Sequence, residues 1–225
     1  VMNYLAKQGA GFPVGDITVP IVCGAVLFDL SIGSSHAHPD IQMGHLAASR
    51  ASDTFPVGCY GAGTGASVGK LRGFAHAMKS GAGYAEFGLP GGLYVGAYMA
   101  VNACGEIYEG DHILAGALSD DDSHFISSHE LMMKGFQRHM GTNTSIGCVM
   151  TNARLTKAEC KAVSGMAHDG YARAIRPVHT TMDGDTVGYL AEEAIRLAIL
   201  DAVRSAESMG GRPAFSDRVK KLSEK

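Results

Sequence analysis

The spacing of apolar and polar positions predicts a mixed α/β chain. Two apolar runs, 82–87 and 93–102, are rich in strand-forming residues and flank a Pro-Gly-Gly turn signal, which predicts a pair of neighbouring strands. A similar run over 17–30 predicts one or two strands, and the run over 145–151 predicts another. No repeat of fixed period is visible.

Two later segments have the period of amphipathic helices. Thr156 and Glu159 have capping-box spacing, and the apolar stripe that follows predicts a helix from Lys157 to about Ile175. A final helix is predicted from about 191 to 208, where a pair of glycines ends it. Strands and helices alternate loosely, so the fold class is α/β or α+β.

Other segments are less regular. The alanine-rich segment 44–52 predicts a short helix, and 59–73 is a glycine-rich turn region. Residues 110–143 are polar and include three consecutive aspartates. Residues 1–9 have the pattern of a helix end stopped by glycine, and not that of the beginning of a domain.

Length and composition favour one globular domain. The chain has 225 residues, of which 46% are hydrophobic and 18% charged. Its net charge of −3 and lack of a basic run argue against a nucleic-acid partner. No apolar run approaches the ~20 residues that span a bilayer, and no export signal is visible, so no membrane partner is expected. Five cysteines without a C-x-x-C motif favour a reducing, cytoplasmic location.

The junction between Asn143 and Thr144 carries the most specific chemistry. Thr144 enters a short apolar run, where its hydroxyl can be held firmly and can attack the carbonyl of Asn143. An N→O acyl shift followed by ester hydrolysis would cut the chain and free the amine of Thr144. That amine, with a pKa near ~8, can serve as the base for the hydroxyl of the same residue. The alternative is a threonine at a strand edge with no chemistry.

Five collinear segments together resemble one family. It is the self-cleaving amidohydrolase group that contains β-peptidyl aminopeptidases, D-amino-acid aminopeptidases and the 6-aminohexanoate-oligomer endohydrolase, which cuts nylon oligomers. The segments are Val19 to Leu30, Tyr60 to Lys70, Val95 to Gly105, Gly141 to Met150 and Pro177 to Thr186. Five segments in one order are more specific than any single glycine-rich string.

The resemblance implies a four-layer αββα sandwich like that of N-terminal-nucleophile hydrolases. It implies one catalytic domain over 1–225 that lacks an N-terminal segment of its relatives, with 1–143 as the α-subunit-like part and 144–225 as the β-subunit-like part. The polar segment before Asn143 resembles the exposed linker that precedes the cut. Small peptides or ω-amino-acid oligomers are the implied substrates, no cofactor is expected, and relatives form homo-oligomers, either dimers or tetramers.

Lys70 and Asn102 match positions with roles in this family. The spacing around Lys70 does not fit a phosphate-binding loop, and the alternative is a surface lysine. The resemblance instead implies a lysine that lines the catalytic pocket beside Thr144, where a buried ammonium stabilises negative charge. It assigns Asn102 to the oxyanion hole, against the alternative of a turn residue after a strand.

The pair Asp183 and Asp185 is implied to lie next to the nucleophile. One carboxylate would pair with the Thr144 ammonium or with Lys70, and the other would orient the substrate or shuttle a proton. The order of these roles stays open. As an isolated pattern, Asp-Gly-Asp is most often a turn or a weak cation loop.

Ten histidines raise the question of a metal. The best cluster, His36, His38, Asp40 and His45, fits no standard zinc spacing, and solvated loop histidines are the favoured interpretation, so no metal is expected. His168 and His179 match positions that many relatives fill with structural histidines. A Ser-His-Asp triad built on Ser145 is a further alternative, but it would leave the Asn-Thr junction unused.

Three departures from the family pattern bear on activity. The N-terminal segment is absent, the turn at 58–61 has Cys-Tyr where relatives have Asn-Val, and the strand after Asp185 is shortened. The expected function is an autoprocessed threonine amidohydrolase or aminopeptidase. The alternatives are an acyltransferase of the ornithine-acetyltransferase type and a non-catalytic, unprocessed relative.

Overall fold

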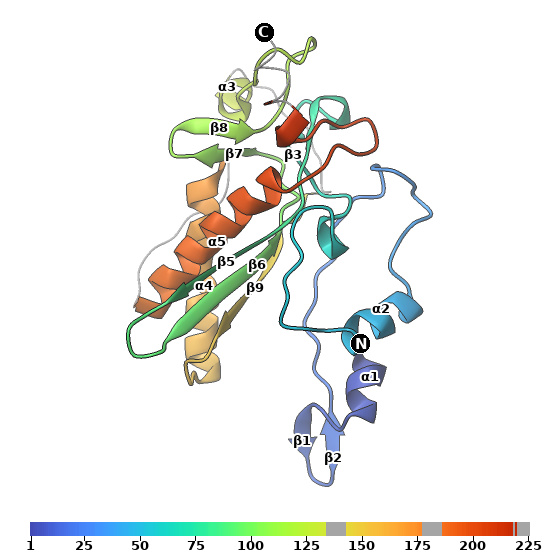
Figure 1. Ribbon diagram of the computed structural model, residues 1–225, viewed down its shortest axis with the longest axis vertical. Helices are drawn as coiled ribbons and strands as arrows, with labels where there is room; N and C mark the ends of the chain where they lie inside the picture. Colours follow the sequence, from blue (N-terminus) through green and yellow to red (C-terminus); the bar gives the residue numbers. More distant parts are fainter. Residues whose placement is uncertain (134–142, 177–185, 218, 220–225) are drawn as a thin grey trace.

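The structure is a computed structural model and describes residues 1–133, 143–176, 186–217 and 219 (Figure 1). These residues form five α-helices and four small sheets whose strands are all antiparallel to their neighbours. The predicted mixture of helices and strands is therefore confirmed. The four-layer order of the sandwich stays a prediction.

The sheet that leads to the candidate site has three strands. Its order is β5 (Ala82–Gly88), β6 (Tyr94–Ala100) and β9 (Ile146–Thr151). The hairpin between β5 and β6 turns at Gly91 and Gly92, whose φ angles of 102° and 87° favour glycine. All three strands lie where the sequence predicts them.

Two long helices cover one face of this sheet (Figure 1). Helix α4 (Lys157–Ala174) begins with the predicted capping box, in which Thr156 and Glu159 satisfy each other's backbone N–H groups. Helix α5 (Thr186–Arg204) begins and ends earlier than the predicted 191–208. The helix includes Gly188, because one glycine inside a helix costs only about 1 kcal/mol.

Glycine allows α5 to lie directly on β5. A Cβ atom at Gly83 would lie 1.7 Å from the carbonyl oxygen of Ala198 and 2.5 Å from the nitrogen of Ala202. The space between helices and sheet is filled by buried aliphatic side chains, and fully buried ones come from both layers. They include Val95, Ala97, Met99, Ile199, Leu200 and Val203.

A second three-stranded sheet corrects the expected polar linker. Its order is β10 (Ile175–Arg176), β7 (Glu106–Glu109) and β8 (His112–Ala115), and helix α3 (Ser128–Met133) follows. Segment 110–143 is thus partly structured, because the short run at 113–115 pairs with β7 and buries its apolar side chains. Residues 134–142, directly before the predicted cut, lie outside the described residues.

The N-terminal elements lie apart from the helix-and-sheet body in Figure 1. They are α1 (Met2–Lys7), β1 (Phe12–Val14), β2 (Ile17–Val19) and α2 (Ile41–Ser49). The predicted helix end before Gly9 is confirmed, and α2 corresponds to the short helix predicted at 44–52.

The strand predicted over 17–30 is wrong beyond residue 19. No strand of the described residues pairs with that stretch, and its apolar side chains are largely exposed, Val26 to 85%. Apolar composition alone therefore overstated the strand.

The glycine-rich region runs from η1 (Gly61–Gly63) through β3 (Ser67–Val68) and η2 (Phe74–His76) to β4 (Met78–Lys79). It crosses the chain just after β6, where the nitrogen of Lys70 donates to the carbonyl of Cys104 at 2.8 Å. This crossing brings the glycine-rich turn to the end of β6.

Candidate functional site

The candidate site is built around the side chain of Asn102, two residues beyond β6. Lys70 Nζ donates to Asn102 Oδ1 at 2.6 Å and lies 3.3 Å from the Asn102 carbonyl oxygen. Both residues are fully buried. The structure therefore brings these two predicted site residues together and excludes the surface interpretation of Lys70.

Three further contacts fix the orientation of Asn102. Its Oδ1 also accepts from the backbone N–H of Ser67 at 3.1 Å, and its Nδ2 donates to the carbonyl of Phe28 at 3.0 Å. The backbone N–H of Asn102 donates to Ser145 Oγ at 3.0 Å. Because both ends of the amide are held by different segments, the side chain cannot rotate without breaking buried hydrogen bonds.

The predicted cleavage junction lies at the edge of this cluster. Asn143 and Thr144 are half-buried, and Ser145 separates them from β9, whose first residue pairs with Ala100 at the end of β6. Ser145, the neighbour of Thr144, is the residue that contacts Asn102. The two strand ends thus hold Thr144 within one residue of the Asn102–Lys70 pair.

Burial makes Lys70 a group that titrates near neutrality. Its pKa is lowered from 10.5 to about 7, chiefly by desolvation, while the nearby Cys104 thiol and the Asp29 carboxylate act in the opposite direction. A lysine of this kind can hold or release a proton at neutral pH. Strongly perturbed groups of this type are enriched at functional sites.

Two neighbours of the site were missed by the sequence reasoning. Lys79 is fully buried beneath the glycine-rich turn, and burial lowers its pKa. Asp29 rests against Gly65, where an added Cβ atom would lie 2.4 Å from Asp29 Oδ2. Its charge raises the pKa of both Lys70 and Lys79. In the sequence, Lys79 and Asp29 are marked only by the apolar residues next to them, and this signal is too weak to predict a role.

Asp183, Asp185 and His179 lie outside the described residues. His168 stacks on Tyr171 with ring centroids 5.3 Å apart. In the part of the chain that the structure describes, no three His, Cys, Asp or Glu side chains come close enough to form a metal site.

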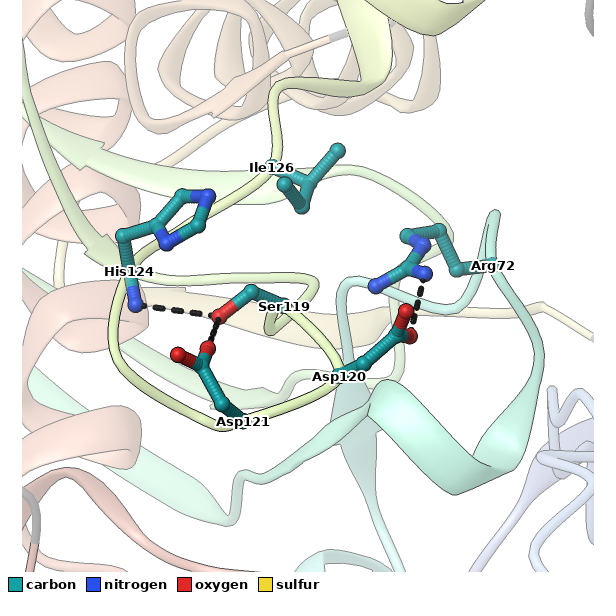
Figure 2. Close-up of a pocket in the computed structure, with 6 residues that line it drawn as sticks. All are labelled: Arg72, Ser119, Asp120, Asp121, His124 and Ile126. Atoms are coloured by element: carbon teal, nitrogen blue, oxygen red, sulfur yellow. Dashed lines mark hydrogen bonds and ion pairs between the residues drawn. The ribbon is translucent and has the colours of Figure 1, made fainter.

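A hollow of about 350 Å³ lies between Arg72, two residues beyond Lys70, and the aspartate-rich loop (Figure 2). Arg72 donates to Asp120 at 2.7 Å, and Ser119 Oγ donates to Asp121 at 2.6 Å. The Arg72 hydrogen bond and charge lower the pKa of Asp120, and hydrogen bonds from Ser119 and Ser123 lower that of Asp121. Asp120 is thus occupied by Arg72, and Asp121 by the serines of its own loop.

Sequence comparison decides the family. The model of peptidase family S58 matches residues 1–194. The chain belongs to peptidase family S58. This agrees with the resemblance on which the site residues were predicted.

Individual S58 relatives carry two kinds of name. An uncharacterized aminopeptidase of Mycobacterium leprae, ML1167, is 33% identical over 261 residues, covering 96% of this chain and 69% of the relative. An uncharacterized aminopeptidase of Mycobacterium tuberculosis, Rv1333, is 34% identical over 204 residues, covering 87% and 57%. A 6-aminohexanoate-oligomer endohydrolase of Kocuria is 29% identical over 214 residues, covering 87% and 59%. The chain thus spans between about half and two thirds of these relatives.

The fold also has a counterpart of known structure. The PH0078 protein from Pyrococcus horikoshii superimposes with a TM-score of 0.59 at 19% identity, covering 98% of this chain and 66% of that protein. At this identity the likeness extends to the fold alone. None of the helices in the described ranges combines the length and apolar character needed to cross a membrane.

Proposed function

We propose that this S58 member hydrolyses linear amide bonds with Thr144 as its nucleophile. The observation that carries the proposal is the hydrogen bond from the Asn102 backbone N–H to Ser145 Oγ, because Ser145 directly follows Thr144 and Asn102 also accepts from a buried lysine with a pKa of about 7. The names of its relatives support the same chemistry, because aminopeptidases and oligomer endohydrolases both cleave amide bonds.

The first step is cleavage of the chain itself. Thr144 Oγ1 attacks the carbonyl carbon of Asn143, the C–N bond breaks, and the nitrogen of Thr144 takes up a proton. Water then hydrolyses the resulting ester, which leaves a carboxylate on Asn143 and a free α-amine on Thr144. Within the described residues the Thr144 hydroxyl has no hydrogen-bond partner that would have to be displaced.

The same hydroxyl then serves the substrate. The α-amine of Thr144 takes the proton of the Thr144 hydroxyl, and the oxygen attacks the substrate carbonyl carbon. The substrate C–N bond then breaks, and the Thr144 ammonium returns the proton to the leaving amine. Water finally hydrolyses the acyl-enzyme, which releases the substrate's carboxylate and restores the Thr144 hydroxyl. Asn102 stabilises the developing oxyanion, and Lys70 stabilises negative charge next to it. Asp183 and Asp185 divide the remaining tasks, pairing with the ammonium group and orienting the substrate or moving a proton.

Substrate and assembly follow the relatives. We expect small peptides or ω-amino-acid oligomers as substrates, a homo-oligomeric enzyme and a cytoplasmic location. No cofactor takes part in any of these steps.

A pair of variants tests the nucleophile. Thr144→Ala should abolish hydrolysis of amino-acid anilides and 6-aminohexanoate oligomers, because it removes the attacking atom. Ser145→Ala is the comparison variant, since it removes the neighbouring hydroxyl, which accepts from the backbone N–H of Asn102 and is the alternative nucleophile. If Thr144→Ala retains activity while Ser145→Ala loses it, the nucleophile is Ser145 and the proposal is wrong.

A further inference from the structure

Lys79 has an environment that a lysine rarely occupies. Its side chain is fully buried, and no carboxylate of the described residues lies within ion-pair distance of its Nζ. The ammonium instead donates to the backbone carbonyls of Gly63 and Ala66, each at 3.0 Å, and of Ser80. Three acceptors therefore match the three N–H donors of the ammonium group.

The carbonyls of Gly63 and Ala66 belong to the glycine-rich turn that leads to the site. Directly after that turn, Ser67 pairs with Lys79 across the two-stranded sheet β3–β4. The backbone N–H of Ser67 donates to Asn102 Oδ1 at 3.1 Å. One continuous set of hydrogen bonds thus leads from the Lys79 ammonium through the turn to Asn102.

Packing alone does not account for a lysine at this position. Desolvating an ammonium group is costly, and a methionine of similar length would fill the same space without that cost. What methionine cannot supply is a set of N–H donors for three buried carbonyls. The carbonyls of Gly63 and Ala66 each accept from one backbone N–H as well, at 3.3 and 2.9 Å, so what methionine removes is the shared donor that ties these two carbonyls to that of Ser80.

From this geometry we infer that Lys79 is a positioning residue for the reaction, which acts through the glycine-rich turn on Ser67 and so on Asn102. The inference rests on the proposed function, because the group being positioned is the proposed oxyanion donor. Lys79 itself touches neither Thr144 nor Ser145. Its loss should therefore lower kcat and leave KM within about threefold, because a displacement of about 1 Å can cost ~100-fold in rate.

A double-mutant cycle on kcat separates positioning from general stability. Lys79→Met should lower kcat by roughly 10- to 100-fold, and Asn102→Ala by roughly 100- to 1,000-fold. If Lys79 acts through Asn102, the double variant should be no slower than Asn102→Ala alone within about threefold. Lys161→Met, which removes an exposed lysine from α4, is the matched control and should leave kcat unchanged.

The outcomes distinguish failure of the positioning role of Lys79 from failure of the proposed function. Multiplicative losses in the double variant, or a normal kcat in Lys79→Met, would overturn the positioning role. If Lys79→Met does not fold, Lys79→Gln, which keeps two N–H donors, enters the same cycle. If the wild-type protein hydrolyses nothing, the proposed function has failed. The positioning role is then decided by amide hydrogen exchange, which must be faster at Ser67 in Lys79→Gln than in wild type, whereas equal exchange contradicts it.

Discussion

Replacing Lys70 by methionine tests the electrostatics of the site directly. In the folded protein Lys70 donates to Asn102 Oδ1 at 2.6 Å, and burial lowers its pKa from 10.5 to about 7. At about 1.4 kcal/mol per pKa unit, this difference corresponds to about 5 kcal/mol between protonation states. Because Lys70 is fully buried, solvent screening reduces this figure little.

The sign follows from proton binding. Between pH 7 and 10.5 the unfolded chain keeps the Lys70 proton while the folded protein releases it, so the free energy of unfolding rises with pH in this window. Lys70→Met removes the group and with it this rise. Lys79 contributes in the same direction, but it is present in both proteins and its effect cancels in the comparison.

Urea unfolding at pH 7, 8, 9 and 10 provides the assay. The free energy of unfolding of wild type, relative to that of Lys70→Met, should increase by about 3.5 kcal/mol across this range, because the range covers most but not all of the two titrations. An offset is expected as well, because in Lys70→Met the Asn102 Oδ1 loses the N–H donor that Lys70 supplies in either protonation state. If the free energies of unfolding of wild type and Lys70→Met change in parallel with pH, Lys70 has an ordinary pKa and the description of the site is wrong.

Three further comparisons test separate parts of the structure. Burial raises the pKa of Glu106 from 4.5 to about 7, so between these pH values the folded protein holds a proton that the unfolded chain releases. As the pH rises from 4.5 to 7, the free energy of unfolding measured with urea should therefore fall by about 3 kcal/mol more in wild type than in Glu106→Gln. Gly83→Ala should destabilise by about 3 kcal/mol or more, because its Cβ would meet the backbone of α5, whereas Gly88→Ala, with open space around it, should leave the melting temperature unchanged. Asn102→Ala should lower kcat by roughly 100- to 1,000-fold in steady-state assays, and a near-normal kcat would remove it from the oxyanion hole.

Local signals in the sequence predicted the regular elements well. The capping box at Thr156 fixed the beginning of α4, and the Pro-Gly-Gly turn fixed the hairpin of β5 and β6. The strand β8 in segment 110–143 was missed, because it is short, begins with His112 and pairs with β7, which begins with Glu106 and looks polar although Glu106 is buried against Ser128. Burial of that kind depends on partners distant in sequence.

The candidate site was predictable only in part. Lys70 and Asn102 were found through the family pattern, and the structure joins them. Lys79 was missed because its partners are backbone carbonyls, which every residue carries and no motif records. Asp29 was missed because its effect on both lysines depends on the fold bringing residue 29 to the glycine-rich turn.

The central claim is that Thr144 becomes a new N-terminus. Intact-mass spectrometry of the purified protein, with N-terminal sequencing of its fragments, tests this most directly. We expect a fragment that begins at Thr144 and a partner that ends at Asn143, and a single uncut chain for Thr144→Ala. A wild-type chain that stays whole after long incubation at neutral pH would contradict the account.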